Sequence, residues 1–169
     1  RWAACSRPSW RHAVASGGGR NHRFSLSDAV MAKDNHLAVL VQQSGLSLTE
    51  ALLAARAKLG HTTHFEVEVD RLDQVAPVLA AGVDTIMLDN FSIAELREGV
   101  ELIAGRATVE ASGGVSLDTV AAIAETGVDV ISVGALTHSA RAIDLGLDMT
   151  LEVATESAFE TAPATGAGA

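Results

Sequence analysis

Residues 17–36, GGGRNHRFSLSDAVMAKDNH, join a glycine run to cationic side chains and a short apolar segment. Three consecutive glycines give a backbone that can adopt positive φ angles and approach a ligand closely. The side chains that follow and can donate hydrogen bonds to an anion are Arg20, His22, Arg23, Lys33 and His36. A glycine run taken alone is most often a mobile loop. This concentration of cationic groups in an acidic chain favours an anion-binding site.

Residues 28–35 form a predicted strand with its core at residues 30–33. Lys33 and His36 then lie at or near the carboxyl end of this strand. Ligands of parallel α/β folds bind at that end of the strands. A lysine there is well placed to bind a carboxylate or a phosphate.

The bulk composition restricts the class of protein. A chain of 169 residues, 48% of them hydrophobic, suits one globular domain with a real core. The net charge of −9 argues against a nucleic-acid partner, because phosphate backbones need a basic face. The single cysteine, Cys5, excludes an internal disulfide and fits a reducing cytoplasm. With no apolar run of membrane-spanning length and no signal-peptide pattern, we expect a cytoplasmic protein without a membrane partner.

Strand and helix patterns alternate after Ser27. Two predicted helices begin with a capping box, a serine followed by glutamate at the third helical position. These are residues 47–59, with Ser47 and Glu50, and residues 92–103, with Ser92 and Glu95. The other predicted helices are residues 72–81, which contain Pro77, and 116–126. The later predicted strands are residues 64–70, 85–90, 108–112 and 130–136.

Continuous alternation of apolar strands with helices indicates a parallel sheet buried on both faces. A closed (β/α)₈ barrel usually needs about 250 residues. A doubly wound sheet is the alternative, but no G-x-G-x-x-G turn follows the first strand. We therefore predict an incomplete (β/α) barrel, TIM-like, with parallel strands and outer helices. It forms a catalytic domain at residues 17–155, between an atypical segment at 1–16 and a disordered tail at 156–169.

Polar side chains follow the carboxyl ends of several predicted strands. In residues 64–70, HFEVEVD, the side chains of Glu66, Glu68 and Asp70 point to one side of the strand. At least one carboxylate must then lie inside the barrel, where it is costly unless a cation or metal pairs with it. A structural ion pair with Lys33 or Arg23 is one interpretation. A carboxylate that faces a bound cation or sugar hydroxyls is the other.

Two glycine-containing loops predict a phosphate site. Ser112-Gly113-Gly114 precedes a predicted helix, and Gly134-Ala135 ends the next predicted strand, close to His138. Glycine lets backbone N–H groups point at an anion, and a helix N-terminus adds a favourable dipole. TIM-type barrels place phosphate sites on their last two strand–helix loops.

The motifs together resemble one family closely, the quinolinate phosphoribosyltransferases, also called nicotinate-nucleotide pyrophosphorylases (carboxylating). The matching segments, in family order over most of the chain, are GGGRNHRFSLSDAVMAKDNH, FEVEVD, TIMLDNF, VEASGGVS and VGALTHS. The resemblance implies that quinolinate reacts with phosphoribosyl pyrophosphate and Mg²⁺ to give nicotinate mononucleotide, pyrophosphate and CO₂. It also implies a homodimer or a higher homo-oligomer.

The resemblance assigns roles to individual residues. It implies that His22, Arg23 and Lys33 hold carboxylates or phosphates, with Lys33 also catalytic. It implies that Glu68 and Asp89 are the catalytic acidic pair, facing the ribose hydroxyls and Mg²⁺ carried by phosphoribosyl pyrophosphate. The phosphate-binding loops it implies contain Ser112, Gly113, Gly114 and Gly134, with His138 nearby.

The chain also departs from the family pattern. Family members have a preceding domain that contributes an arginine to the partner's site, and a Thr-Arg-Lys stretch before the glycines. Residues 1–11, RWAACSRPSWR, do not match that stretch. We therefore expect a truncated or frame-disrupted chain whose resemblance begins near His12. Two alternatives stay open: a non-catalytic remnant, and a related phosphoribosyltransferase-like enzyme that uses a different ring acid.

Overall fold

The computed structural model describes residues 7–139, 144 and 146–149. Its helices and strands in chain order are α1 (Arg7–Ser16), β1 (Ala29–Ala32), α2 (Asp34–Ser44), α3 (Leu48–Arg56), β2 (His64–Val69), η1 (Leu72–Gln74), α4 (Val75–Ala80), β3 (Thr85–Asp89), α5 (Ile93–Ile103), β4 (Thr108–Ser112), α6 (Val120–Ala124), β5 (Val130–Ile131) and α7 (Ala135–His138). The tail predicted at residues 156–169 lies outside the described residues.

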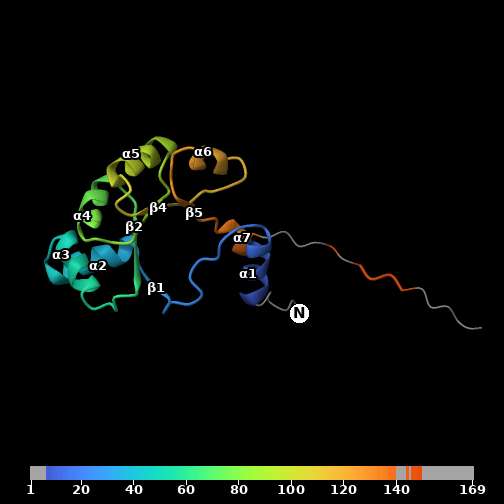
Figure 1. Cartoon of the computed structure of the whole chain (residues 1–169), viewed down its shortest axis with the longest axis horizontal. Helices are drawn as coiled ribbons and strands as arrows, with labels where there is room; N and C mark the ends of the chain where they lie inside the picture. The colour runs from blue at the N-terminus through green and yellow to red at the C-terminus, as the bar shows by residue number, and fades with distance from the viewer. Residues whose placement is uncertain (1–6, 140–143, 145, 150–169) are drawn as a thin grey trace, which may run out of the picture.

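The strands form one parallel sheet whose spatial order equals their order in the chain. The five strands run β1-β2-β3-β4-β5, with each strand paired to the next in parallel. A doubly wound sheet would reverse its order at a switch point, and this sheet does not. Helices α2 to α6 form an arc outside the sheet (Figure 1). Since β1 and β5 are not paired with one another, the prediction of an incomplete barrel is confirmed.

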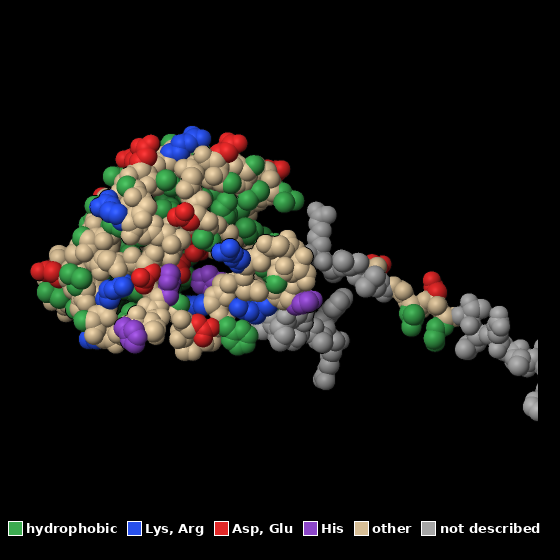
Figure 2. Space-filling view, viewed as in Figure 1, with side chains coloured by type: hydrophobic (Ala, Val, Ile, Leu, Met, Phe, Trp, Pro, Cys, Tyr) green, Lys and Arg blue, Asp and Glu red, His purple; other side chains and the backbone are tan. Residues whose placement is uncertain are grey.

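The two faces of the sheet differ in chemistry. On β2, Phe65, Val67 and Val69 are at most 1% exposed and join the core that also includes Leu52 of α3. The alternate residues of β2, Glu66 and Glu68, are also buried but lie outside that apolar cluster. The alternation predicted for this strand therefore puts two carboxylates on the inner face. Figure 2 shows acidic, basic and histidine side chains around a hollow on the face it presents.

Both capping boxes predicted from the sequence are present. The N–H of Glu50 donates to the Ser47 hydroxyl at the beginning of α3, and the Glu50 carboxylate accepts from the N–H of Ser47. At the beginning of α5, Ser92 and Glu95 make the same pair of contacts. These reciprocal contacts satisfy N–H groups that the first turn of a helix leaves without partners.

The sequence pattern missed α2 and put its first residues in a strand. β1 ends at Ala32, and Asn35 and His36 lie in the first turn of α2. The N–H of Lys33 donates to Nδ1 of His36 at 3.1 Å. Histidine thus stands where glutamate stands in the other two boxes, so the usual signature of a helix start was absent.

Two further predicted elements are shorter than expected. The helix predicted from Ser116 begins only at Val120, because the N–H of Ser116 donates to the Thr119 hydroxyl at 2.9 Å and closes a turn first. The strand predicted at residues 130–136 ends at Ile131. Its continuation instead turns into the short helix α7, since the N–H groups of Thr137 and His138 donate to the carbonyl of Gly134.

Within the described residues, no single helix has the length and hydropathy needed to cross a membrane. The bent pair α2 and α3 passes that test by length and composition only.

Candidate functional site

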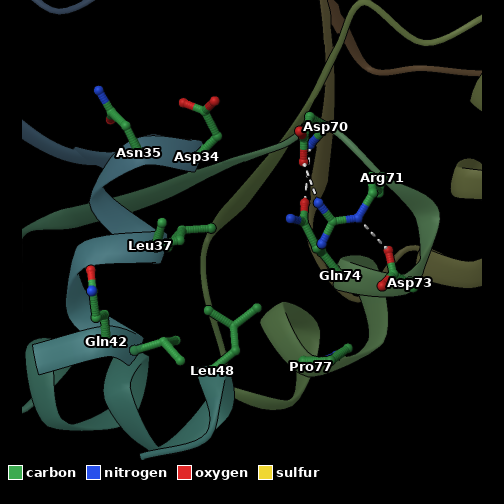
Figure 3. Close-up of a pocket in the computed structure, with 12 residues that line it drawn as sticks. Asp34, Asn35, Leu37, Gln42, Leu48, Asp70, Arg71, Asp73, Gln74 and Pro77 are labelled. Carbon is green, nitrogen blue, oxygen red and sulfur yellow. Dashed lines mark hydrogen bonds and ion pairs between the residues drawn. The ribbon is translucent and has the colours of Figure 1, made fainter. Parts of the chain in front are cut away.

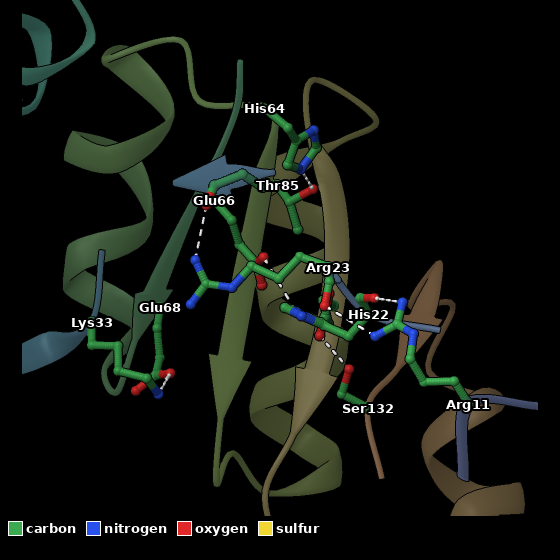
Figure 4. Close-up of polar contacts among 11 residues, drawn as sticks. Arg11, His22, Arg23, Lys33, His64, Glu66, Glu68, Thr85 and Ser132 are labelled. Atoms are coloured by element: carbon green, nitrogen blue, oxygen red, sulfur yellow. Dashed lines mark hydrogen bonds and ion pairs between the residues drawn. The ribbon is translucent and has the colours of Figure 1, made fainter. Parts of the chain in front are cut away.

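Lys33 and Glu68 form an ion pair at the carboxyl ends of β1 and β2. Lys33 Nζ lies 2.5 Å from Glu68 Oε2, and the two side chains are 47% and 9% exposed (Figure 4). The hydrogen bond with Glu68 raises the pKa of the Lys33 ammonium above its ordinary value, and the negative charge of Asp89 acts in the same direction. The pair combines a buried carboxylate with a half-exposed ammonium, which an anionic ligand can reach.

Asp89 ends β3 and is half-buried. Its carboxylate accepts a hydrogen bond of 2.7 Å from the Asn90 side chain, and its charge acts on Lys33. Lys33, Glu68 and Asp89 therefore come from three neighbouring strands and lie at one edge of the sheet, as parallel pairing requires. This part of the predicted site is brought together.

His22 and Arg23 lie on the loop between α1 and β1. Nε2 of His22 lies 3.7 Å from Oε2 of Glu66, a buried carboxylate on the inner face of β2. The Arg23 guanidinium donates to the carbonyl of Ala29 at 2.8 Å, and its charge acts on Glu66. Both residues therefore act on Glu66, but part of the hydrogen-bonding capacity of Arg23 is used to hold its own loop.

Arg11 of α1 positions this loop, a role that no residue pattern in the sequence predicts. Its guanidinium donates to the backbone carbonyls of His22 at 2.8 Å and of Arg23 at 3.3 Å. The same guanidinium lies over the Phe24 ring, 5.0 Å from its centroid. The N-terminal segment at residues 1–16, predicted to be atypical, therefore holds the backbone of His22 and Arg23 in place through Arg11.

The loops after β3 and β4 interlock. The N–H of Asn90 donates to the carbonyl of Ser112 at 2.9 Å, and Asn90 itself has a φ of 60°. Gly113 and Gly114 follow with φ values of 89° and 61°. A Cβ added to Gly113 would lie 2.2 Å from Oδ1 of Asn90. Gly113 is therefore required by both its backbone angle and the close approach of the neighbouring loop.

Gly134 and His138 lie near one another after β5, because a Cβ built on Gly134 would lie 3.2 Å from Nε2 of His138. Gly134 precedes helix α7 and does not end a strand, because β5 stops at Ile131. Nδ1 of His138 lies 2.7 Å from the Ser139 hydroxyl. Among the described residues, no hydrogen bond or ion pair joins Gly134 or His138 to Lys33, Glu68 or Asp89. The phosphate-binding role expected of Gly134 and His138 stays a prediction.

A second acidic centre lies deeper on the inner face. Glu66 and Glu110 are 5% and 6% exposed. Glu110 accepts a short hydrogen bond from the Ser132 hydroxyl, while Oε1 of Glu66 accepts none. Both glutamates lie on predicted strands, but their proximity depends on how the sheet places β2 relative to β4, which sequence spacing does not supply.

Burial raises the pKa of the Glu66 carboxyl to about 7, and the negative charge of Glu110 adds to this shift. The folded state thus binds a proton that the unfolded chain releases near pH 4.5. This contribution to stability is complete below about pH 4.5 and is lost as the pH rises through about 7.

We expect Glu66→Gln to change the pH dependence of stability. Between pH 5.5 and 8.5 the free energy of unfolding should fall by about 2 kcal/mol more in the original chain than in this variant. This value follows from about 1.4 kcal/mol for each pH unit between 5.5 and the pKa of about 7. Urea unfolding in the presence of a chelator measures the difference. Glu125→Gln, which neutralises an exposed carboxylate, should keep the original profile. Parallel profiles for the chain and Glu66→Gln would contradict the prediction.

A separate groove lies on the outer side, between α2 and the η1–α4 region (Figure 3). Arg71 there is paired with Asp70 at 3.6 Å and with Asp73 at 3.1 Å. Asp70, predicted on the same side as Glu66 and Glu68, thus ends on the exposed rim beyond β2. The groove contains none of the predicted site residues.

Comparison with known proteins identifies relatives of this architecture. Residues 6–148 match the family model described as "Quinolinate phosphoribosyl transferase, C-terminal domain". The match begins before His12, the position from which the sequence resemblance was expected. A probable nicotinate-nucleotide pyrophosphorylase [carboxylating] of Bacillus subtilis is 42% identical over 141 residues, covering 83% of this chain and 47% of the relative. A chloroplastic relative of Arabidopsis thaliana is 42% identical, covering 85% of this chain and 45% of the relative.

Solved structures agree with the sequence relatives. NadC from Streptococcus pyogenes superposes with a TM-score of 0.76 at 42% identity, covering 84% of this chain and 48% of that one. The nicotinate-nucleotide pyrophosphorylase of Francisella tularensis gives a TM-score of 0.70 at 41% identity, covering 79% of this chain and 46% of that one. The chain thus spans about half the length of the relatives it matches.

Proposed function

The chain belongs to the quinolinate phosphoribosyltransferase family, whose C-terminal domain it matches, and on that premise we propose that it acts in phosphoribosyl transfer to quinolinate. In this reaction the ring nitrogen of quinolinate displaces pyrophosphate from phosphoribosyl pyrophosphate. Loss of CO₂ then gives nicotinate mononucleotide. The observation that carries the proposal is the meeting of Lys33, Glu68 and Asp89 at the carboxyl ends of three neighbouring strands.

The chemistry of these three groups suits the proposed reaction. Departure of pyrophosphate leaves positive charge on the ribose, and carboxylates such as Glu68 and Asp89 stabilise that charge in the transition state. The Lys33 ammonium offers a charge-assisted contact to a carboxylate or phosphate of the substrates. His22 and Arg23, on the loop between α1 and β1, are the other basic residues that we propose to bind the quinolinate carboxylates.

Mg²⁺ enters the proposal with phosphoribosyl pyrophosphate. Carboxylate oxygens are ligands that Mg²⁺ accepts, commonly through one or two carboxylates together with substrate phosphates and water. Glu68 and Asp89 fit that requirement, although Lys33 already occupies one oxygen of Glu68. When bound, Mg²⁺ would neutralise charge on the departing pyrophosphate. In this proposal Glu68 and Asp89 orient the ribose, and Glu68 keeps Lys33 beside it.

The loop of Ser112, Gly113 and Gly114 is proposed to bind phosphate. Both glycines have positive φ angles, which a residue without a Cβ adopts without strain. Such a backbone conformation can turn successive N–H groups toward an anion. Gly134 and His138 remain proposed phosphate contacts in this family setting. A homo-oligomer and a cytoplasmic location are also proposed; bacterial relatives support that location, whereas some plant relatives are named mitochondrial or chloroplastic.

The test is formation of nicotinate mononucleotide by the purified chain from quinolinate, phosphoribosyl pyrophosphate and Mg²⁺. We expect one CO₂ per product, released from the 2-carboxyl group and followed with label at that carbon. Nicotinate, which lacks that carboxyl group, should give no product, and this arm separates the proposal from an enzyme for another ring acid. A folded chain that binds neither quinolinate nor phosphoribosyl pyrophosphate in calorimetry would overturn the proposal and favour a non-catalytic remnant.

A further inference from the structure

His22, Glu66 and Glu110 converge on the inner face from three separate segments. His22 comes from the loop before β1, Glu66 from β2 and Glu110 from β4, with β3 between the two strands. One ligand atom from each residue lies within 4.8 Å of the other two. Figure 4 shows the His22 ring and the Glu66 carboxylate turned toward one another.

The cluster contains an unsatisfied buried oxygen. Glu66 is 5% exposed, and its Oε1 accepts no hydrogen bond. The neighbouring cations are engaged elsewhere, because Lys33 is paired with Glu68 and Arg23 donates to the carbonyl of Ala29. A buried carboxylate oxygen without a partner costs free energy, and a second buried carboxylate beside it adds repulsion. The charge of Arg23 acts on Glu66, yet within the described part of the chain no group donates a hydrogen bond to Oε1.

We propose that His22, Glu66 and Glu110 form a binding site for a first-row divalent transition-metal ion such as Mn²⁺ or Zn²⁺. One imidazole nitrogen and two carboxylate oxygens are a common donor set for such ions, with further positions open to water or an anion. The imidazole distinguishes the site from the Mg²⁺ carried by phosphoribosyl pyrophosphate, because Mg²⁺ strongly prefers oxygen ligands. The site therefore shares no ligand with the proposed Glu68 and Asp89 centre, whereas it does share His22 with the proposed quinolinate contacts.

The geometry needs a modest closure on metal binding. Donor atoms about 2.1 Å from a tetrahedral ion lie about 3.4 Å from one another, closer than the 4.8 Å limit of the cluster. Glu66 and Glu110 are held by the sheet, whereas the His22 side chain is 43% exposed on a loop. His22 is thus the ligand that can move. Oε1 of Glu110 accepts a hydrogen bond from the Ser132 hydroxyl, which orients the carboxylate as outer hydrogen bonds do in known sites.

The test measures metal binding without either substrate, so its outcome does not depend on the proposed activity. The full, tag-free chain is titrated with Mn²⁺ and followed by electron paramagnetic resonance, and with Zn²⁺ in competition with a chromophoric chelator. We expect one ion per chain and no displacement by equimolar Mg²⁺. Glu66→Gln and His22→Ala should each weaken binding at least tenfold.

Two matched controls separate this site from adventitious binding. Glu125→Gln and His61→Ala remove an exposed carboxylate and an exposed imidazole outside the cluster, and both should bind as the original chain does. Circular dichroism verifies that each variant is folded; His22→Ala, a surface change, keeps the test valid if Glu66→Gln fails to fold. Absence of stoichiometric binding, or binding unchanged in His22→Ala, would overturn the proposal.

Discussion

Lys33→Ala is expected to lower the formation of nicotinate mononucleotide at least a hundredfold. The substitution removes the half-exposed ammonium that lies 2.5 Å from Glu68. A cationic contact to a substrate carboxylate or phosphate is lost, and such preorganised charges contribute about two to three orders of magnitude to the rate. Product formation and calorimetric affinity for quinolinate are the two measurements. Lys58→Ala, at an exposed lysine after α3, should leave both unchanged.

The same substitution should also lower stability, and a second variant separates the two effects. Lys33→Ala leaves the buried Glu68 carboxylate without its partner, at an expected cost of about 1 to 2 kcal/mol, less than for a fully buried pair because Lys33 is half-exposed. Adding Glu68→Gln should recover most of that stability but none of the activity. If the double variant regained activity, Lys33 would serve only to neutralise Glu68.

The sequence predicted the features whose signals are local. The alternation in HFEVEVD placed Glu66 and Glu68 on one side of their strand, with at least one carboxylate inside, because side chains along a strand have a period of two. Ser47 and Ser92 predicted their helices because a capping box is contained within four residues. Lys33, Glu68 and Asp89 could be placed together because the ends of consecutive parallel strands share one edge.

The features that the sequence did not predict depend on contacts between distant segments. Glu66 and Glu110 come from β2 and β4 with β3 between them, and the register aligns Glu110, through Met87, with Glu68 and not with Glu66. Arg11 reaches the backbone of the loop that carries His22, a contact without any residue pattern. The sequence does not predict helix α2, because His36 stands where a capping box usually has glutamate. The first residues of the helix were therefore included in the strand predicted at residues 28–35.

Gly113→Ala is expected to cost at least about 3 kcal/mol of stability and to abolish phosphate binding at this loop. The φ of 89° strains any residue with a Cβ, which alone accounts for about 1 to 2 kcal/mol. The added carbon would also lie 2.2 Å from Oδ1 and 2.8 Å from the backbone nitrogen of Asn90. The side chain of Asn90 can rotate away, but its backbone nitrogen is held by the carbonyl of Ser112.

Gly114→Ala is the matched control for this prediction. Gly114 has a φ of 61°, yet a Cβ there would meet nothing within 4 Å. Its alanine variant should therefore show only the backbone strain, about 1 kcal/mol. Urea unfolding gives the two free energies, and calorimetry with phosphoribosyl pyrophosphate gives the two affinities. Combining Gly113→Ala with Asn90→Gly should recover only part of the loss, because the contact with the backbone nitrogen remains. Equal destabilisation by Gly113→Ala and Gly114→Ala would mean that the loops after β3 and β4 separate easily, which would contradict the close approach of Asn90 to Gly113.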